Sequence, residues 1–119
     1  MKDLGQVFDE LKTILAVHAD DMNVISDTPE NYYLNTSKTD EKGKPVFFGM
    51  VKVNKQKVAF HLMPVYCEPA LLDGLSDELR KRMQGKSCFN FTQSSPELFT
   101  ELGELTQAGF DSYKAAGKI

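Results

Sequence analysis

The stretch from Val46 to Met63 constrains the fold of this chain more than any other part of the sequence. β-branched and aromatic residues dominate both halves of the stretch, and polar residues gather in its middle, which is typical of a two-stranded hairpin. If Lys55 and Gln56 form the loop, Asn54 faces Lys57 and the other cross-strand pairs follow outward. Because side chains alternate between the two faces of a strand, this register assigns every residue of the hairpin to one face.

The two faces of this hairpin differ in chemistry. One face is wholly apolar and is expected to face the core, together with two residues of a later strand: Val51, Val53, Val58, Phe60, Leu62, Phe89 and Phe91. The other face mixes an aromatic ring, thioethers, an ammonium group and an imidazole, and its predicted members are Phe48, Met50, Lys52, His61 and Met63. Cys88 and Asn90 join them if the later strand pairs nearby. A sheet face that meets only water would carry threonine, lysine and glutamate instead.

Before the hairpin, residues 3–18 carry apolar side chains at three- and four-residue spacing and are expected to form an amphipathic helix. Two short strands, Met22–Asp27 and Asn31–Thr36, follow around a turn that contains Pro29. Residues 37–45 contain no apolar residue apart from Pro45, so this segment is expected to be an exposed loop.

After the hairpin, Pro69 is expected to open a helical turn, and Ser76 to cap the start of a short helix that stops at Gly85. Residues 87–92 alternate in the manner of a strand. Pro96 opens the last helix, with Ser94 as its capping-box residue.

The expected order is therefore helix, four strands, helix, strand, helix. Short connections between consecutive strands imply antiparallel pairing. The predicted fold is a single two-layer α+β domain over residues 1–119, with a five-stranded antiparallel sheet and about three helices. In such a domain the second face of the sheet is open to solvent or to a partner unless a helix covers it.

Composition excludes some classes of function. The chain has 14 basic and 17 acidic residues and a net charge of −3, which argues against a nucleic-acid partner. No apolar run approaches the roughly 20 residues that span a bilayer, which argues against a membrane protein. The sequence shows no signal-peptide core, so a cytoplasmic location is expected. The two cysteines, Cys67 and Cys88, form no Cys-x-x-Cys motif and are expected to be free thiols.

The hairpin from Phe47 to Pro64 is followed by a short helix, the segment Gly85-Lys86-Ser87-Cys88-Phe89-Asn90-Phe91 and a proline-started helix. This combination, over roughly residues 44–115, resembles the YdhG-like domains, most of which have no assigned function. The chain departs from that pattern at Lys57 and Val58, since the family tends to carry a histidine early in this strand, and in the polar lead-in that ends at Pro45. The YdhG-like fold is similar to that of frataxins, so the resemblance implies iron as a cofactor or cargo.

Three hypotheses of function follow. The first is a non-enzymatic binding module that uses the mixed face for a small molecule or a protein partner. The second is a frataxin-like iron carrier whose oxygen ligands come from the first helix and its exit: Asp3, Asp9, Glu10, Asp20 and Asp21. The third is an enzyme in which Cys88 is the nucleophile and His61 lies beside it. His18 is expected to close the first helix, where a partial positive charge suits the helix dipole.

Overall fold

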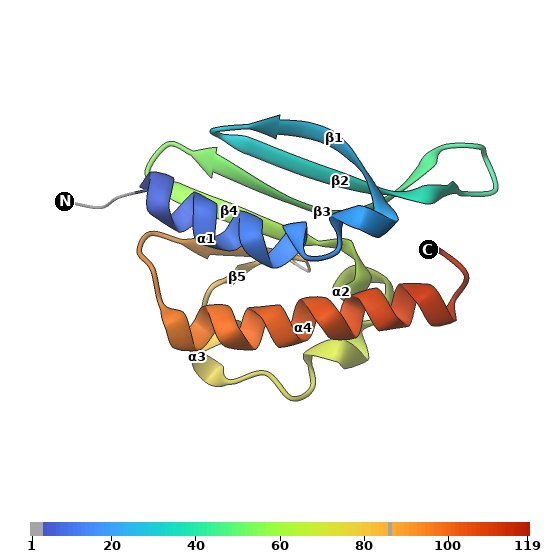
Figure 1. Ribbon diagram of the computed structural model, residues 1–119. Helices are drawn as coiled ribbons and strands as arrows, with labels where there is room; N and C mark the ends of the chain where they lie inside the picture. The colour runs from blue at the N-terminus through green and yellow to red at the C-terminus, as the bar shows by residue number, and fades with distance from the viewer. Residues whose placement is uncertain (1–3, 86) are drawn as a thin grey trace.

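A six-stranded antiparallel sheet and a layer of helices make up the protein in the computed structural model, which describes residues 4–85 and 87–119 (Figure 1). The strand order across the sheet is β1-β2-β3-β4-β6-β5. The strands are β1 (Met22–Thr28), β2 (Asn31–Thr39), β3 (Pro45–Asn54), β4 (Lys57–Leu62), β5 (Met83–Gln84) and β6 (Cys88–Phe91). The helices are α1 (Leu4–Ala16), α2 (Met63–Cys67), α3 (Asp77–Arg80) and α4 (Pro96–Ala115), with 3₁₀ turns η1 (Ala19–Asp21) and η2 (Pro69–Leu72).

The α+β class and the antiparallel sheet are confirmed, but the sheet has six strands rather than five and there are four α-helices rather than about three. The extra strand arises because α3 ends after one turn, at Arg80, and Met83–Gln84 then pairs with β6. Gly85 was expected to end that helix, and this was wrong. Its φ of +83° places it in the tight turn that joins β5 to β6, a conformation that glycine adopts at little cost.

The central hairpin has the register that its sequence predicts. Asn54 pairs with Lys57, and the outward pairs continue to Gly49 with Leu62. Ser76 also caps α3 as expected, since its hydroxyl accepts a hydrogen bond from the Leu79 amide at 3.2 Å.

Two local expectations were wrong. Ser94 does not form a capping box, because its hydroxyl donates to the carboxylate of Glu10 on α1, and Ser95 is the N-cap residue of α4. The expected loop over residues 37–45 is shorter than predicted, because β2 continues to Thr39 and β3 begins at Pro45. Asp40 supports the remaining turn by accepting hydrogen bonds from two backbone amides.

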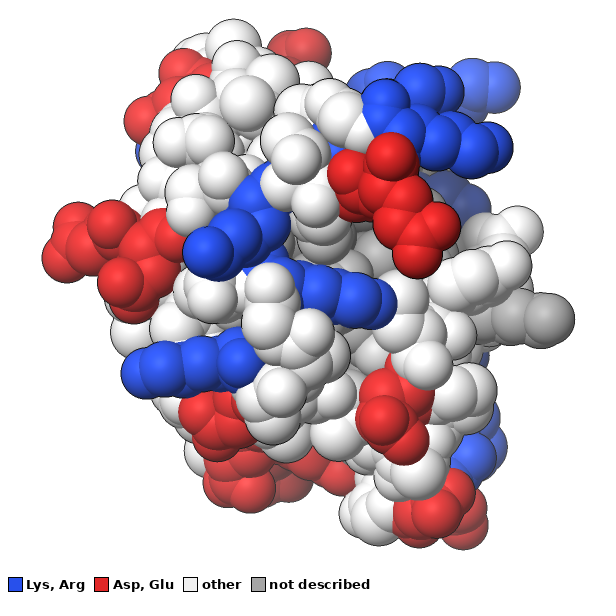
Figure 2. All heavy atoms as spheres, turned by 90° about the vertical axis from the view of Figure 1, so that its right-hand side faces the viewer, with Lys and Arg blue, Asp and Glu red and all other residues white. Residues whose placement is uncertain are grey.

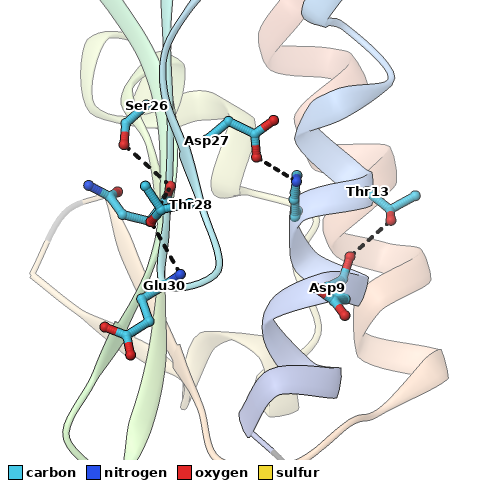
Figure 3. Close-up of polar contacts among 8 residues, drawn as sticks. Asp9, Thr13, Ser26, Asp27, Thr28 and Glu30 are labelled. Carbon is cyan, nitrogen blue, oxygen red and sulfur yellow. Dashed lines mark hydrogen bonds and ion pairs between the residues drawn. The ribbon is translucent and has the colours of Figure 1, made fainter.

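The core lies between the sheet and the helices. Four residues of the apolar stripe of α1 are buried in it, namely Val7, Phe8, Leu11 and Leu15. Leu4 and Ile14 are partly buried against it. The apolar face of the hairpin lies opposite and is buried as expected, apart from Val53, which is half-buried. One ion pair fastens α1 to the edge strand: Lys12 Nζ lies 2.6 Å from Asp27 Oδ1, and this bond raises the pKa of Lys12 (Figure 3).

Phe48 does not lie on the mixed face, contrary to the prediction. Leu34 pairs with Gly49 but Asn35 pairs with Phe47, so Phe48 is the extra residue of a β-bulge in β3. The bulge turns the Phe48 ring toward the helices, where it is 0% exposed. Its ring centroid lies 6.0 Å from that of His18, 6.4 Å from that of Phe110 and 5.8 Å from that of Tyr113. Regular alternation, on which the prediction was based, fails at a bulge.

Met63 is the second member of the predicted mixed face that lies elsewhere. It is the first residue of α2, and its side chain packs against the hydrophobic core. The prediction extended β4 by one residue too many. Pro64 cannot continue the strand ladder, because it has no backbone N–H, and the chain turns into a helix there.

Candidate binding face of the sheet

The helices lie together on one side of the sheet (Figure 1). The register of the strands gives the composition of the opposite side. One row of directly paired residues crosses all six strands: Ser26, Tyr33, Met50, His61, Cys88 and Gln84. A second row runs beside it: Thr28, Asn31, Lys52, Ala59 and Asn90. We call these two rows, with Asn35, Phe47 and Lys57 that flank them, the uncovered face.

Five of the residues predicted for the mixed face do lie on the uncovered face: Met50, Lys52, His61, Cys88 and Asn90. The prediction missed the contributions of β1, β2, β5 and the bulge, which are Ser26, Thr28, Asn31, Tyr33, Asn35, Phe47 and Gln84. The sequence of β2 held a signal for its part of the face. Tyr32 and Leu34, which are buried beneath the helices, alternate with the more polar Asn31, Tyr33 and Asn35.

The β2–β3 half of the uncovered face has an apolar centre. The rings of Tyr33 and Phe47 stack with their centroids 4.8 Å apart, and Met50 is the direct partner of Tyr33 in the ladder. All three side chains are half-buried by their neighbours on the face. They form a preassembled apolar surface, and the thioether of Met50 adapts easily to an irregular partner.

The β4–β6–β5 half is polar and internally hydrogen-bonded. Gln84 Oε1 accepts from Asn90 Nδ2 at 2.7 Å and from Lys57 Nζ at 3.3 Å. Cys88 Sγ lies 3.8 Å from Asn90 Oδ1 as a weak donor. These bonds hold the amide groups of the face in defined orientations.

Two amide oxygens of the uncovered face lack a partner. Asn31 Oδ1 and Asn35 Oδ1 are the buried side-chain oxygens without a hydrogen bond among the described residues, and they flank Tyr33 on β2. Leaving a buried acceptor unpaired costs about 1–3 kcal/mol. Both costs therefore fall on one face of the molecule, on oxygens that the chain itself buries.

The pair of Cys88 and His61 has unfavourable electrostatics for catalysis. They are direct cross-strand neighbours, as the enzyme hypothesis requires. However, burial raises the pKa of Cys88, which the nearby Lys57 offsets only in part, and burial lowers the pKa of His61. Both shifts oppose the thiolate and imidazolium forms on which cysteine nucleophiles depend.

The structure separates the acidic residues of the metal hypothesis. Asp9 and Glu10 lie on α1, where Glu10 accepts a hydrogen bond from Ser94, whereas Asp20 and Asp21 lie on η1 beyond the end of that helix. Asp3 lies outside the described residues. Over residues 4–85 and 87–119, no three His, Cys, Asp or Glu side chains are placed to hold a metal ion together.

His18 is a core residue rather than a charged helix cap. It is 6% exposed, and its ring stacks on Phe110 with the centroids 4.6 Å apart. Burial lowers the pKa of His18, and the nearby carboxylates of Asp111 and Asp21 oppose this shift only in part. The imidazole is therefore neutral at neutral pH. The prediction that His18 places a favourable positive charge at the end of the first helix was wrong.

Acidification is expected to destabilise the protein through His18 and His61. Because burial holds the pKa of each histidine below its unfolded value of about 6.5, the unfolded chain binds more protons as the pH falls below that value. The free energy of unfolding should therefore be highest above about pH 6.5 and decrease towards pH 5. Urea denaturation at a series of pH values measures this slope, and His18→Phe should reduce it. If the free energy of unfolding of His18→Phe depends on pH as steeply as that of the wild type, His18 is not a source of the acid destabilisation.

Two clefts of the described chain are lined by residues outside the two rows. One cleft of about 560 Å³ is lined by Val65, Tyr66, Pro69, Leu72, Met83 and Gly85. Another, of about 500 Å³, lies between the β2–β3 turn and the C-terminal residues, and Lys38, Lys42 and Lys118 line it together with Asp40 and Glu41. Basic and acidic side chains are intermixed at this end of the molecule (Figure 2), so it presents no surface of a single charge.

Comparison with known proteins gives no match to any family model, curated protein or solved structure. Among the described helices, none is both long enough and apolar enough to cross a membrane.

Proposed function

We propose that this chain is a non-enzymatic binding module, and that its uncovered face captures a protein partner or a small ligand. The observation that supports this most directly is the row Tyr33–Met50–His61–Cys88, which continues across the sheet on the side away from the described helices (Figure 1). Apolar walls with a few oriented polar groups are the usual lining of binding sites. Gln84 and Asn90, which are joined by a hydrogen bond, supply such oriented polar groups.

The uncovered face fits a broad, flat partner better than a deep-pocket ligand. Its residues lie on paired strands, and the clefts described above are formed by other parts of the chain. A protein surface is therefore the first candidate, and a planar small molecule that stacks on Tyr33 and Phe47 is the second.

We also propose that the chain is a YdhG-like domain, on the strength of its hairpin and of the segment from Gly85 to Phe91. The frataxin-like iron carrier is the alternative function that this resemblance implies. The separation of Asp9 and Glu10 from Asp20 and Asp21 weighs against it.

Met50→Glu is expected to leave the fold intact and to abolish capture. Met50 is half-buried at the middle of the uncovered face, so the free protein can accommodate a carboxylate at this position. Burying the same carboxylate beneath an apolar partner is costly. We expect the free energy of unfolding to change by less than about 1 kcal/mol. Immobilised wild-type and variant proteins, exposed to the same cell extract and analysed by mass spectrometry, report the loss of partners.

Val17→Glu is the matched control for this experiment. It makes the same apolar-to-acidic change at a side chain that is 70% exposed beyond the end of α1. It should retain every partner. If Met50→Glu retains them as well, the uncovered face is not the binding surface. Native mass spectrometry of both variants extends the test to small molecules.

A further inference from the structure

We infer that a second copy of this chain occupies the uncovered face, so that two sheets pack face to face between two layers of helices. This inference rests on the proposed function and names the partner. Four properties of the uncovered face support it: its charge, its extent, its amide groups and the position of its centre.

The uncovered face is poor in charge although 26% of the chain is charged. Among the described residues of the face, Lys52 and Lys57 are basic and none is acidic. Both lysines lie near the β3–β4 turn, at one end of the hairpin, and Lys57 is already bonded to Gln84. Aromatic residues and methionine at the centre with charges at the rim are typical of interfaces between identical subunits. An acidic or basic partner would require a larger set of complementary charges.

The extent of the face suits a stable dimer. Six strands spaced about 4.8 Å apart give a width of roughly 24 Å, and a strand of six residues, such as β4, is about 20 Å long. The projected area is therefore on the order of 500 Å², and the accessible area of such an uneven surface is larger. This approaches the roughly 800 Å² that each partner contributes to a standard interface. Aligned packing of two twisted sheets is an established arrangement for such faces.

The amide groups of the face can satisfy one another across a two-fold axis. In an isologous contact the same patch meets itself, so the donors of one copy come from the same residues as the acceptors of the other. An asparagine side chain carries both a donor amide and an acceptor oxygen. A second copy therefore presents both donors and acceptors to the amide groups of the face, among which Asn90 already donates to Gln84 within one copy.

The centre of the face lies at Met50 and His61, because β3 and β4 are the third and fourth of the six strands. A two-fold axis through the middle of the interface brings this centre close to its own copy. A carboxylate at position 50 would then be buried beside an identical carboxylate, which is strongly unfavourable.

Sedimentation equilibrium of the full chain, from micromolar to millimolar concentration, tests the inference. The wild type should reach twice the mass of the chain. Met50→Glu should weaken dimerisation by at least about 30-fold, as expected for the loss of a central contact. Val17→Glu should dimerise like the wild type. A wild type that stays monomeric, or a Met50→Glu variant that dimerises normally, overturns the inference.

Methyl NMR of the wild type provides a measurement that does not depend on a folded variant. On dilution the Met50 methyl signal should shift, whereas the signal of Met22, which is buried beneath the helices, should not. If dilution shifts the Met50 and Met22 methyl signals equally, or shifts neither of them, the inference is overturned. If the wild type is monomeric but Met50→Glu abolishes capture of its partners, only the dimer is overturned. If Met50→Glu keeps both the partners and the dimer, the proposed function is contradicted as well.

Discussion

Phe48→Ala is expected to lower the free energy of unfolding by about 3–5 kcal/mol, the largest effect that we predict for one substitution. Phe48 is completely buried and contacts the rings of His18, Phe110 and Tyr113. Its removal would leave a cavity between the sheet and the helices, and it would also abolish three edge-to-face contacts. Phe47→Ala is the matched comparison, because the same ring is removed one position earlier.

Phe47 lies on the uncovered face, where its ring stacks on Tyr33 and remains partly exposed to solvent. That stack contributes about 0.5–1.5 kcal/mol beyond the area that it buries. Because Phe47 is only half-buried, we expect Phe47→Ala to cost less than Phe48→Ala. Urea denaturation of the two variants measures the contrast. Equal costs, or a larger cost for Phe47→Ala, would show that β3 is regular at this point and that Phe48 faces away from the helices.

Gly109→Ala is expected to destabilise the protein although alanine is the better helix former. A Cβ at position 109 would lie 2.9 Å from Cβ and 3.2 Å from Cγ of Pro64, so α4 and α2 would have to move apart. The proline ring is rigid and cannot rotate away. Overpacking of this kind typically costs about 1–3 kcal/mol, which exceeds the gain of about 0.5–1 kcal/mol in helix propensity.

Gly103→Ala is the control, since it makes the same change on the same helix. Apart from the adjoining backbone of α4 itself, no atom of the described residues lies within 4 Å of the Cβ that it would add, so only the gain in helix propensity remains. We expect this variant to be more stable than the wild type by about 0.5–1 kcal/mol. Thermal and urea denaturation of both variants should give effects of opposite sign. If both substitutions stabilise the protein, the close approach of α4 to Pro64 is not maintained in solution.

Local features of the fold follow from the sequence alone. The hairpin register was predicted pair by pair because a two-residue loop determines which residues face each other, and one wholly apolar face excludes a slip by one residue. The cap of α3 at Ser76 was also predicted, because an N-cap bond spans three residues and needs no tertiary contact. The juxtaposition of Met50, His61 and Cys88 likewise follows from alternation once β6 is paired with β4.

The remaining features required the tertiary structure, because they depend on contacts between residues far apart in the chain. The bulge at Phe48 places an aromatic ring among residues of α4 and the end of α1, and Tyr113 of α4 donates a hydrogen bond to the Phe47 carbonyl at 2.9 Å. The strand β5 exists because β6 offers it a partner, which local propensity over two residues could not indicate. The sequence alone therefore determined the central hairpin and the chemistry of its two faces. Packing of α1 and α4 decided which face is covered, and it exchanged Phe48 for Phe47 on the face that stays open.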